Sequence, residues 1–225
     1  MGKKFRDFDP YVLEAFEFDF SSRHARINHG TVLLSWFVEP PKGSRRALEL
    51  GAGSGVISIY LAKNFGLEVT GVEVDRELHA VATKNASLNG VENLTRFVNC
   101  DIDDYAANNR GEVFDMVVSN PPHFLHSGVE SPDGKRNRAR RIDPELAMVF
   151  ASATSKLLKN RGAFFFLLHP RDLTKWVRLL EDFKLGIHKM RFAHGSMEGQ
   201  AQLVLVSGRK SSSSEIVVEP PIRMR

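Results

Sequence analysis

Short apolar runs alternate with longer amphipathic stretches along the chain from residue 44 onward. The apolar runs predict strands, and the stretches between them have the apolar spacing of helices. Runs such as Val117-Val118 lack polar alternation, which is typical of strands buried on both faces. The predicted strands are residues 47–50, 68–74, 94–100, 114–119, 163–168, 186–192 and 201–207, and the predicted helices are residues 56–64, 77–89, 144–158 and 173–183.

The order of these elements predicts an α/β fold. Strands that alternate with helices form a parallel sheet, and right-handed crossovers place helices on both of its faces. The last two predicted strands follow each other without a helix, so one of them runs antiparallel. We expect a doubly wound, mostly parallel sheet of Rossmann-like form, on which residues 9–26 pack as an extension. Ligands of such sheets bind at the carboxyl ends of the strands.

The composition is that of a folded globular protein, with 42% hydrophobic and 26% charged residues in a chain of 225. The single cysteine, Cys100, excludes an intramolecular disulfide and a cysteine-rich zinc site, and we expect no bound metal. No secretory signal is visible, and the longest nearly uncharged runs, such as residues 162–170, are too short to span a bilayer. We expect a cytoplasmic protein with no membrane partner, and its net charge of +4 permits a polyanionic partner.

A glycine-rich turn follows the first predicted strand. Gly51, Gly53 and Gly55 allow a tight turn into a helix and a close approach of a ligand to the backbone. The N-terminus of that helix favours a phosphate or a carboxylate. Val56 stands where a dinucleotide fingerprint has its third glycine, so the spacing departs from that fingerprint. A tight turn of small residues that serves packing alone is the alternative interpretation.

Acidic residues follow the next two predicted strands. Glu73 lies about twenty positions after the glycines, where a carboxylate accepts hydrogen bonds from ribose hydroxyls. Asp101 follows the third strand and is a candidate acceptor for an adenine amino group or a cap of the next helix. Asp75 and Asp103 are interpreted as candidate helix caps.

The fourth predicted strand ends in Asn120-Pro121-Pro122, the most informative segment of the chain. The prolines fix their φ angles and lack N–H groups, so the turn is stiff and presents carbonyl acceptors beside the Asn side chain. These acceptors could bind both hydrogens of an exocyclic amine and aim its lone pair at an electrophile. Catalysis would then rest on orientation and electrostatics rather than on a strong base.

Together, these motifs resemble those of the class I S-adenosylmethionine-dependent methyltransferases that modify amino nitrogens, over about residues 30–207. The resemblance implies a seven-stranded sheet with one antiparallel strand. It also implies that the cofactor's methionine lies near the glycine loop, its ribose on Glu73 and its adenine near Asp101. The expected cofactor residues are Thr31, Glu49, Gly51, Gly53, Gly55, Glu73, Asp101 and Asn120, and the expected catalytic residues are Asn120, Pro121, Pro122 and His123.

A narrower resemblance is to bacterial tRNA adenine-N6 methyltransferases that act next to the anticodon of a valine tRNA. It rests on residues 29–34, the basic stretch 137–141, residues 203–210 and residues 217–221. It implies adenine N6 of a tRNA as the target. At His123 the chain departs from this family, which usually has Tyr or Phe there to stack on the flipped base, and the departure puts the exact substrate in doubt.

The segment after the Asn-Pro-Pro turn supplies the expected substrate contacts. His123 and Phe124 offer ring faces for a base, and a general-base role for His123 is the alternative. Arg138, Arg140 and Arg141 are expected to contact RNA phosphates, and a solvated charged surface is the alternative.

The expected organisation is an N-terminal extension (1–30), a methyltransferase domain (31–210) and a C-terminal tail (211–225). Adenine N6 in tRNA is the favoured target. Guanine N2 of rRNA, cytosine N4, a protein glutamine N5 and a non-catalytic scaffold that binds cofactor and RNA are the alternatives. The oligomeric state stays open.

Overall fold

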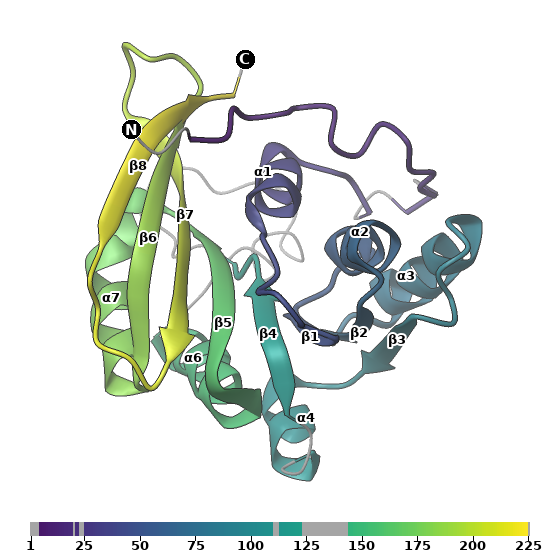
Figure 1. The fold of residues 1–225 in the computed structure, drawn as a ribbon. Helices are drawn as coiled ribbons and strands as arrows, with labels where there is room; N and C mark the ends of the chain where they lie inside the picture. Colours follow the sequence, from purple (N-terminus) through teal and green to yellow (C-terminus); the bar gives the residue numbers. More distant parts are fainter. Residues whose placement is uncertain (1–4, 20, 23–24, 110–112, 123–143, 225) are drawn as a thin grey trace.

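The computed structural model describes residues 5–19, 21–22, 25–109, 113–122 and 144–224 (Figure 1). The helices are α1 (His29–Phe37), α2 (Val56–Phe65), α3 (Arg76–Leu88), α4 (Ile102–Asn108), α6 (Pro144–Leu157) and α7 (Leu173–Asp182), with a 3-10 turn at Pro170–Asp172. The strands are β1 (Arg46–Leu50), β2 (Glu68–Glu73), β3 (Thr95–Asn99), β4 (Phe114–Ser119), β5 (Leu158–Leu168), β6 (Leu185–His194), β7 (Ala201–Lys210) and β8 (Val217–Arg223). Every predicted strand and helix is present, and the largest difference is the start of β5 at Leu158 rather than at residue 163.

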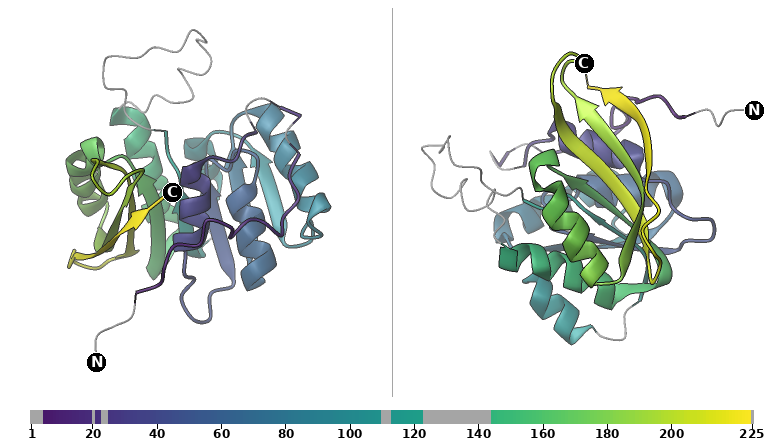
Figure 2. Two further views of the ribbon diagram at one scale, coloured as in Figure 1. Left: turned by 90° about the horizontal axis from the view of Figure 1, so that it is seen from above. Right: turned by 90° about the vertical axis from the view of Figure 1, so that its left-hand side faces the viewer.

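The strands form one sheet in the order β3-β2-β1-β4-β5-β7-β6-β8. β7 is antiparallel to its neighbours β5 and β6, and the other pairs are parallel. This confirms the doubly wound, mostly parallel sheet with one antiparallel strand. Among the described residues the sheet has eight strands rather than the expected seven, because part of the expected C-terminal tail forms β8 beside β6 at the edge of the sheet (Figure 2).

The sheet is buried on both faces, as the uninterrupted apolar runs predict. Val117 packs in a cluster with α4, α6 and α7, whereas its neighbour Val118 packs in a cluster with α1 and α2 on the opposite face. Both valines are completely buried. Successive side chains of a strand point to opposite faces, so a strand between two helical layers needs apolar residues at consecutive positions.

The N-terminal strap, residues 5–19, crosses the outer side of α1 and α2 and reaches α3 (Figure 1). Phe8 packs edge-on against Trp36 of α1 at 5.4 Å between ring centroids, and Phe16 packs on Tyr60 of α2 at 5.8 Å. The strap therefore lies on the domain over much of the length expected for the packed extension.

Three elements were not predicted: α4, a short helix of 7 residues, and the two elements α1 and β8. Five consecutive residues of α1, from Leu33 to Phe37, are buried, so its sequence has no polar face and no helical period. β8 contains Pro220 and Pro221, and proline within a strand is confined to sheet edges and bulges. Within the described parts of the chain, the helices are all too short or too polar to cross a membrane.

Candidate active site

The motifs predicted at the ends of the strands lie together at the carboxyl ends of β1, β2 and β4. β1 lies between β2 and β4, so the glycine loop after β1 has Glu73 on one side and Asn120 on the other. The strand order reverses between β1 and β4, where ligands of doubly wound sheets bind. The arrangement therefore brings together a candidate ligand site from segments far apart in the sequence.

The shape of the glycine loop leaves room beside its backbone. Gly53 has a φ of 55°, a left-handed conformation that L side chains rarely adopt, and a Cβ added there would meet nothing within 4 Å. At Gly55, with φ 79°, a Cβ would lie 2.7 Å from Cζ of Phe97, so a side chain is excluded. The turn itself is held because the N–H groups of Gly51 and Ala52 both donate to the Val72 carbonyl, at 3.0 and 2.9 Å. The loop is therefore held by its hydrogen bonds to β2, and space for a ligand remains beside Gly53.

Glu73 ends β2 and faces the glycine loop. Its carboxylate accepts from the N–H of Gly53 at 2.7 Å and from the N–H of Asp75 at 2.9 Å. The side chain is almost buried, and this burial raises the pKa of its carboxyl group. Glu73 therefore ties the end of β2 to the middle of the loop and keeps an acceptor at the site. Asp75 caps α3 as predicted, accepting from the N–H groups of Glu77 and Leu78.

Glu49 lies beneath the loop, where only 2% of its surface is exposed. It accepts from the N–H of Ser58 at 2.8 Å and from the Ser58 hydroxyl. Burial raises the pKa of Glu49 to about 8, although the hydrogen bonds from Ser58 act in the opposite direction. Burial therefore favours the protonated form of the carboxyl group, which holds the first turn of α2 against the end of β1.

Asp101 and Thr31 lie at the starts of two helices. Asp101 is the exposed residue before α4, and its side chain makes no capping hydrogen bond. Its position is that of a cap, but the bond that defines a cap is not formed, and the adenine-binding role stays a prediction. Thr31 lies in the first turn of α1, and its N–H donates to Asn28 Oδ1 at 2.9 Å.

Asn120 follows β4 and lies beside the start of α1. A Cβ added to Gly30 would lie 3.5 Å from Asn120 Nδ2 and only 2.6 Å from Leu167 Cδ2. The Ser119 hydroxyl donates to the Leu50 carbonyl at 2.8 Å, which joins the end of β4 to the start of the glycine loop. The close approach of α1 to Asn120 was missed from the sequence, because α1 itself was not predicted.

Of the residues after Asn120, Pro121 is buried and Pro122 half-buried. The remaining expected substrate residues, His123, Phe124, Arg138, Arg140 and Arg141, lie outside the described residues.

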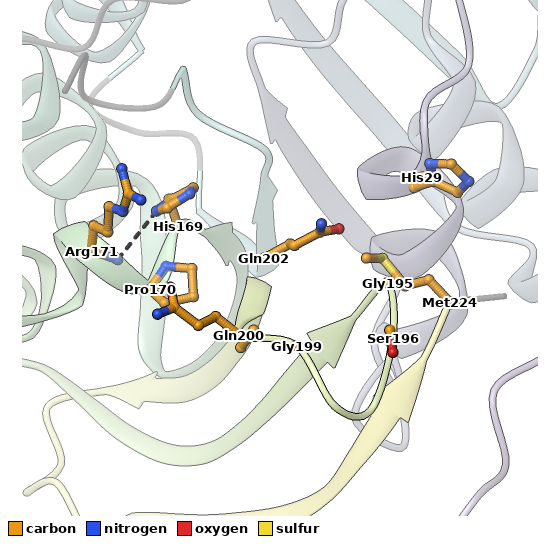
Figure 3. A pocket seen from close by; sticks show the side chains of 11 residues that line it. His29, His169, Pro170, Arg171, Gly195, Ser196, Gly199, Gln200, Gln202 and Met224 are labelled. Carbon is orange, nitrogen blue, oxygen red and sulfur yellow. Dashed lines mark hydrogen bonds between the residues drawn. The ribbon is translucent and has the colours of Figure 1, made fainter. Parts of the chain in front are cut away.

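A pocket of about 680 Å³ adjoins this site (Figure 3). We name it the His169 pocket. Its lining residues are His29, His169, Pro170, Arg171, Gly195, Ser196, Gly199, Gln200, Ala201, Gln202 and Met224. They come from the start of α1, the turn after β5, the β6–β7 connection, the first two residues of β7 and the residue after β8. No sequence motif links these segments, and only the position of His169 at the end of a predicted strand hinted at a pocket edge.

Comparison with known proteins identifies the family. The family model described as the methyltransferase small domain matches residues 20–169. The chain belongs to this methyltransferase family. It is 28% identical to a protein of Pedobacter heparinus over 82% of this chain and 77% of that protein. It is 31% identical to a protein of Porphyromonas gingivalis over 76% and 69% of the two chains. Both relatives are named tRNA1(Val) (adenine(37)-N6)-methyltransferase.

Solved structures show the same fold. A 16S rRNA N2 methyltransferase of T. thermophilus, solved with AdoMet and guanosine, is 25% identical to this methyltransferase with a TM-score of 0.59, over 85% of this chain and 45% of that chain. A predicted O-methyltransferase of Agrobacterium tumefaciens has a TM-score of 0.66 at 18% identity, over 87% of each chain. The second likeness concerns the fold alone.

Proposed function

We propose that this methyltransferase transfers a methyl group from S-adenosylmethionine to adenine N6 of a tRNA. The position of Asn120-Pro121-Pro122 carries the proposal, because this set of acceptors follows β4 next to the glycine loop. The names of the relatives from Pedobacter heparinus and Porphyromonas gingivalis support adenine N6 and tRNA.

The glycine loop and its surroundings fit S-adenosylmethionine. The open space at Gly53 admits a ligand close to the backbone, and the Glu73 carboxylate beside it suits ribose hydroxyls. We assign the acceptor for the adenine amino group to Asp101, which lies exposed before α4, and a further cofactor contact to Thr31 in the first turn of α1. Glu49, which lies beneath the glycine loop, contributes to the cofactor site indirectly, because it fixes the start of α2. When bound, S-adenosylmethionine supplies an electrophilic methyl group.

Asn120 and the carbonyl groups of the proline turn act on the target amine. The two N–H groups of the amine donate to the Asn120 side chain and to a backbone carbonyl. These hydrogen bonds withdraw the nitrogen lone pair from conjugation with the ring and aim it at the methyl group. The nitrogen exchanges one proton for the methyl group, and that proton leaves to water. Orientation and local dipoles carry this catalysis.

The RNA contacts of the proposal lie in the segment after Pro122. A base within a stacked loop must be extruded before its amine reaches Asn120, and ring faces hold an extruded base. We assign this role to His123 and Phe124, and phosphate contacts to Arg138, Arg140 and Arg141. In the proposed organisation, residues 31–210 form the catalytic domain.

The test is methyl transfer from labelled S-adenosylmethionine to unmodified tRNA, rRNA and a protein extract, followed by digestion to nucleosides and mass spectrometry. We expect the label as N6-methyladenosine in tRNA. Label in cytosine or in protein would overturn the tRNA adenine assignment and keep the Asn-Pro-Pro mechanism. Cofactor binding without transfer to any of these substrates would favour a scaffold.

Guanine N2 of rRNA is the second candidate. It is favoured by the likeness to the T. thermophilus enzyme, whose structure contains guanosine. An exocyclic amine on guanine would engage Asn120 in the same way. The same digestion separates the two candidates, because N2-methylguanosine and N6-methyladenosine differ in mass.

A further inference from the structure

The His169 pocket lies close to Asn120 in the fold. In the parallel pairing of β4 and β5, Ser119 lies opposite Phe166, so the chain after Ser119 runs beside the end of β5, which leads into His169. Gly30 closes the gap, since a Cβ there would contact both Leu167 and Asn120, and its neighbour His29 lines the pocket. The pocket lining therefore includes His29, whose neighbour in the chain, Gly30, lies beside the proposed catalytic side chain of Asn120.

The lining of the pocket is rich in hydrogen-bond donors. Among the described residues that line it there is no Asp or Glu, whereas Arg171, two imidazoles and the amides of Gln200 and Gln202 are present. Its volume of about 680 Å³ lies within the range of about 300–1,000 Å³ that is typical of ligand sites. Such a lining suits a ligand with a phosphate and a polar edge, and a nucleotide has both.

Several of these groups are held in place. Gln202 projects between His169 and His29 in Figure 3, and its amide packs on Gly195, where an added Cβ would lie 3.1 Å from Gln202 Oε1. His169 Nδ1 accepts from the N–H of Arg171 at 3.2 Å, so a neutral His169 carries its proton on Nε2 and donates from there.

The β6–β7 connection is braced on both sides. His194 Nδ1 lies 2.9 Å from the Gly199 carbonyl, and the N–H of Gly199 donates to the Ser196 carbonyl at 3.0 Å. The N–H of Met224, after β8, donates to the His194 carbonyl at 2.9 Å. The β6–β7 connection, which leads to Gln202 in β7, is therefore anchored to the rest of the sheet in the absence of a ligand.

We propose that the His169 pocket binds the nucleotide next to the methylated base, with its phosphate on Arg171 and the edge of its base on Gln202. The inference rests on the proposed function, because a base extruded toward Asn120 leaves its neighbour in the chain at the adjoining pocket. An amide reads a base edge through paired donor and acceptor atoms, and a guanidinium suits a phosphate.

The test compares the variants Arg171→Ala and Gln202→Ala with Arg178→Ala, which removes the same charge from the exposed side of α7. Binding of an unmodified tRNA transcript is measured with S-adenosylhomocysteine present, at several salt concentrations. We expect a loss of about tenfold for the two pocket variants. Arg171→Ala should also reduce the salt slope by about 1, because one phosphate contact is lost.

A further variant keeps Gln202 and moves it. Gly195→Ala places a methyl group against the Gln202 amide and should weaken RNA binding in the same direction as Gln202→Ala. Binding of S-adenosylhomocysteine alone, measured by calorimetry, shows that each variant keeps a folded cofactor site.

The outcomes separate this inference from the proposed function. If the wild-type protein methylates tRNA and the pocket variants bind it as Arg178→Ala does, the pocket assignment is wrong and the function stands. If the wild-type protein binds tRNA without methylating it and the pocket variants lose affinity, the pocket binds RNA, but the proposed function fails and the assignment to the neighbour of a methylated base fails with it. A wild-type protein that binds no RNA overturns both.

Discussion

Asn85 joins the N-terminal strap to the glycine loop, and its replacement tests whether the loop needs this support. Its side chain is completely buried in α3, where Nδ2 donates to the Ser54 carbonyl at 2.9 Å and Oδ1 accepts from the Asp19 N–H at 2.7 Å. Asn89, one turn later, holds the strap but does not touch the loop: its side chain bonds the Glu17 carbonyl at 2.6 Å and the Glu17 N–H at 3.2 Å, and its Nδ2 also donates to the Asn85 carbonyl at 2.9 Å. The two asparagines form a matched pair.

Asn85→Ala leaves two backbone groups without their side-chain partner, one in the loop and one in the strap, and Asn89→Ala leaves the two groups of Glu17 and the Asn85 carbonyl without theirs. An unpaired buried polar group costs about 1–3 kcal/mol, so either variant should lose about 2–4 kcal/mol of unfolding free energy. In a chain of 225 residues this lowers Tm by about 5–15 °C. Only Asn85→Ala releases the Ser54 carbonyl, and one lost hydrogen bond there should weaken cofactor affinity by about tenfold.

The assay is thermal unfolding of both variants, together with calorimetric titration of S-adenosylmethionine. We expect similar losses of Tm and a selective loss of affinity in Asn85→Ala, with Asn89→Ala within about twofold of wild type. Equal losses of affinity in the two variants would show that the strap, rather than the Asn85 bond, supports the loop. Unchanged affinity in Asn85→Ala would refute the reasoning.

Three further predictions concern the carboxylates and the proposed catalytic amide. Glu73→Gln removes a charged acceptor and should weaken S-adenosylmethionine binding by about 1–3 kcal/mol in calorimetry, whereas Glu68→Gln at the far end of β2 should not change it. Asn120→Ala should lower kcat by about 10²–10³ with cofactor affinity retained, and a variant with normal turnover would remove Asn120 from the mechanism. Glu49 has its pKa raised from 4.5 to about 8, so wild-type stability should fall as pH rises through this interval, because the unfolded chain loses that proton first. Urea unfolding of Glu49→Gln, whose amide keeps an acceptor for Ser58, should show a weaker fall over the same interval.

The seven strands β1 to β7 and the mostly parallel character of the sheet were predictable because they follow from local patterns. Apolar runs such as 114–119 need burial on both faces, and the chain offers helices at regular intervals to provide it. The start of β5 was predicted less accurately, since residues 158–162 are mixed in polarity, and the pairing with β4 is irregular between Leu158 and Ala163.

The pattern of apolar and polar residues could not predict α1, β8 or the His169 pocket. α1 is buried around most of its circumference, which removes the polar face that marks a helix in sequence. β8 gains its place from the exposed edge of β6, and its prolines argue against a strand until that edge is known. The His169 pocket combines residues more than a hundred positions apart, such as His29 and Gln202.

The sequence by itself determined the fold class, the glycine loop, the acidic residue after β2 and the Asn-Pro-Pro turn, because each is a local motif whose place at a strand end follows from the pattern around it. Only the tertiary structure decided that α1 lies against Asn120, that Glu49 is buried beneath the loop, and that Asn85 links the loop to the strap. These relations arise when packing brings together segments that have no local interaction with each other. The energies of these contacts depend on burial and on distance in space, and the spacing of residues along the chain predicts neither.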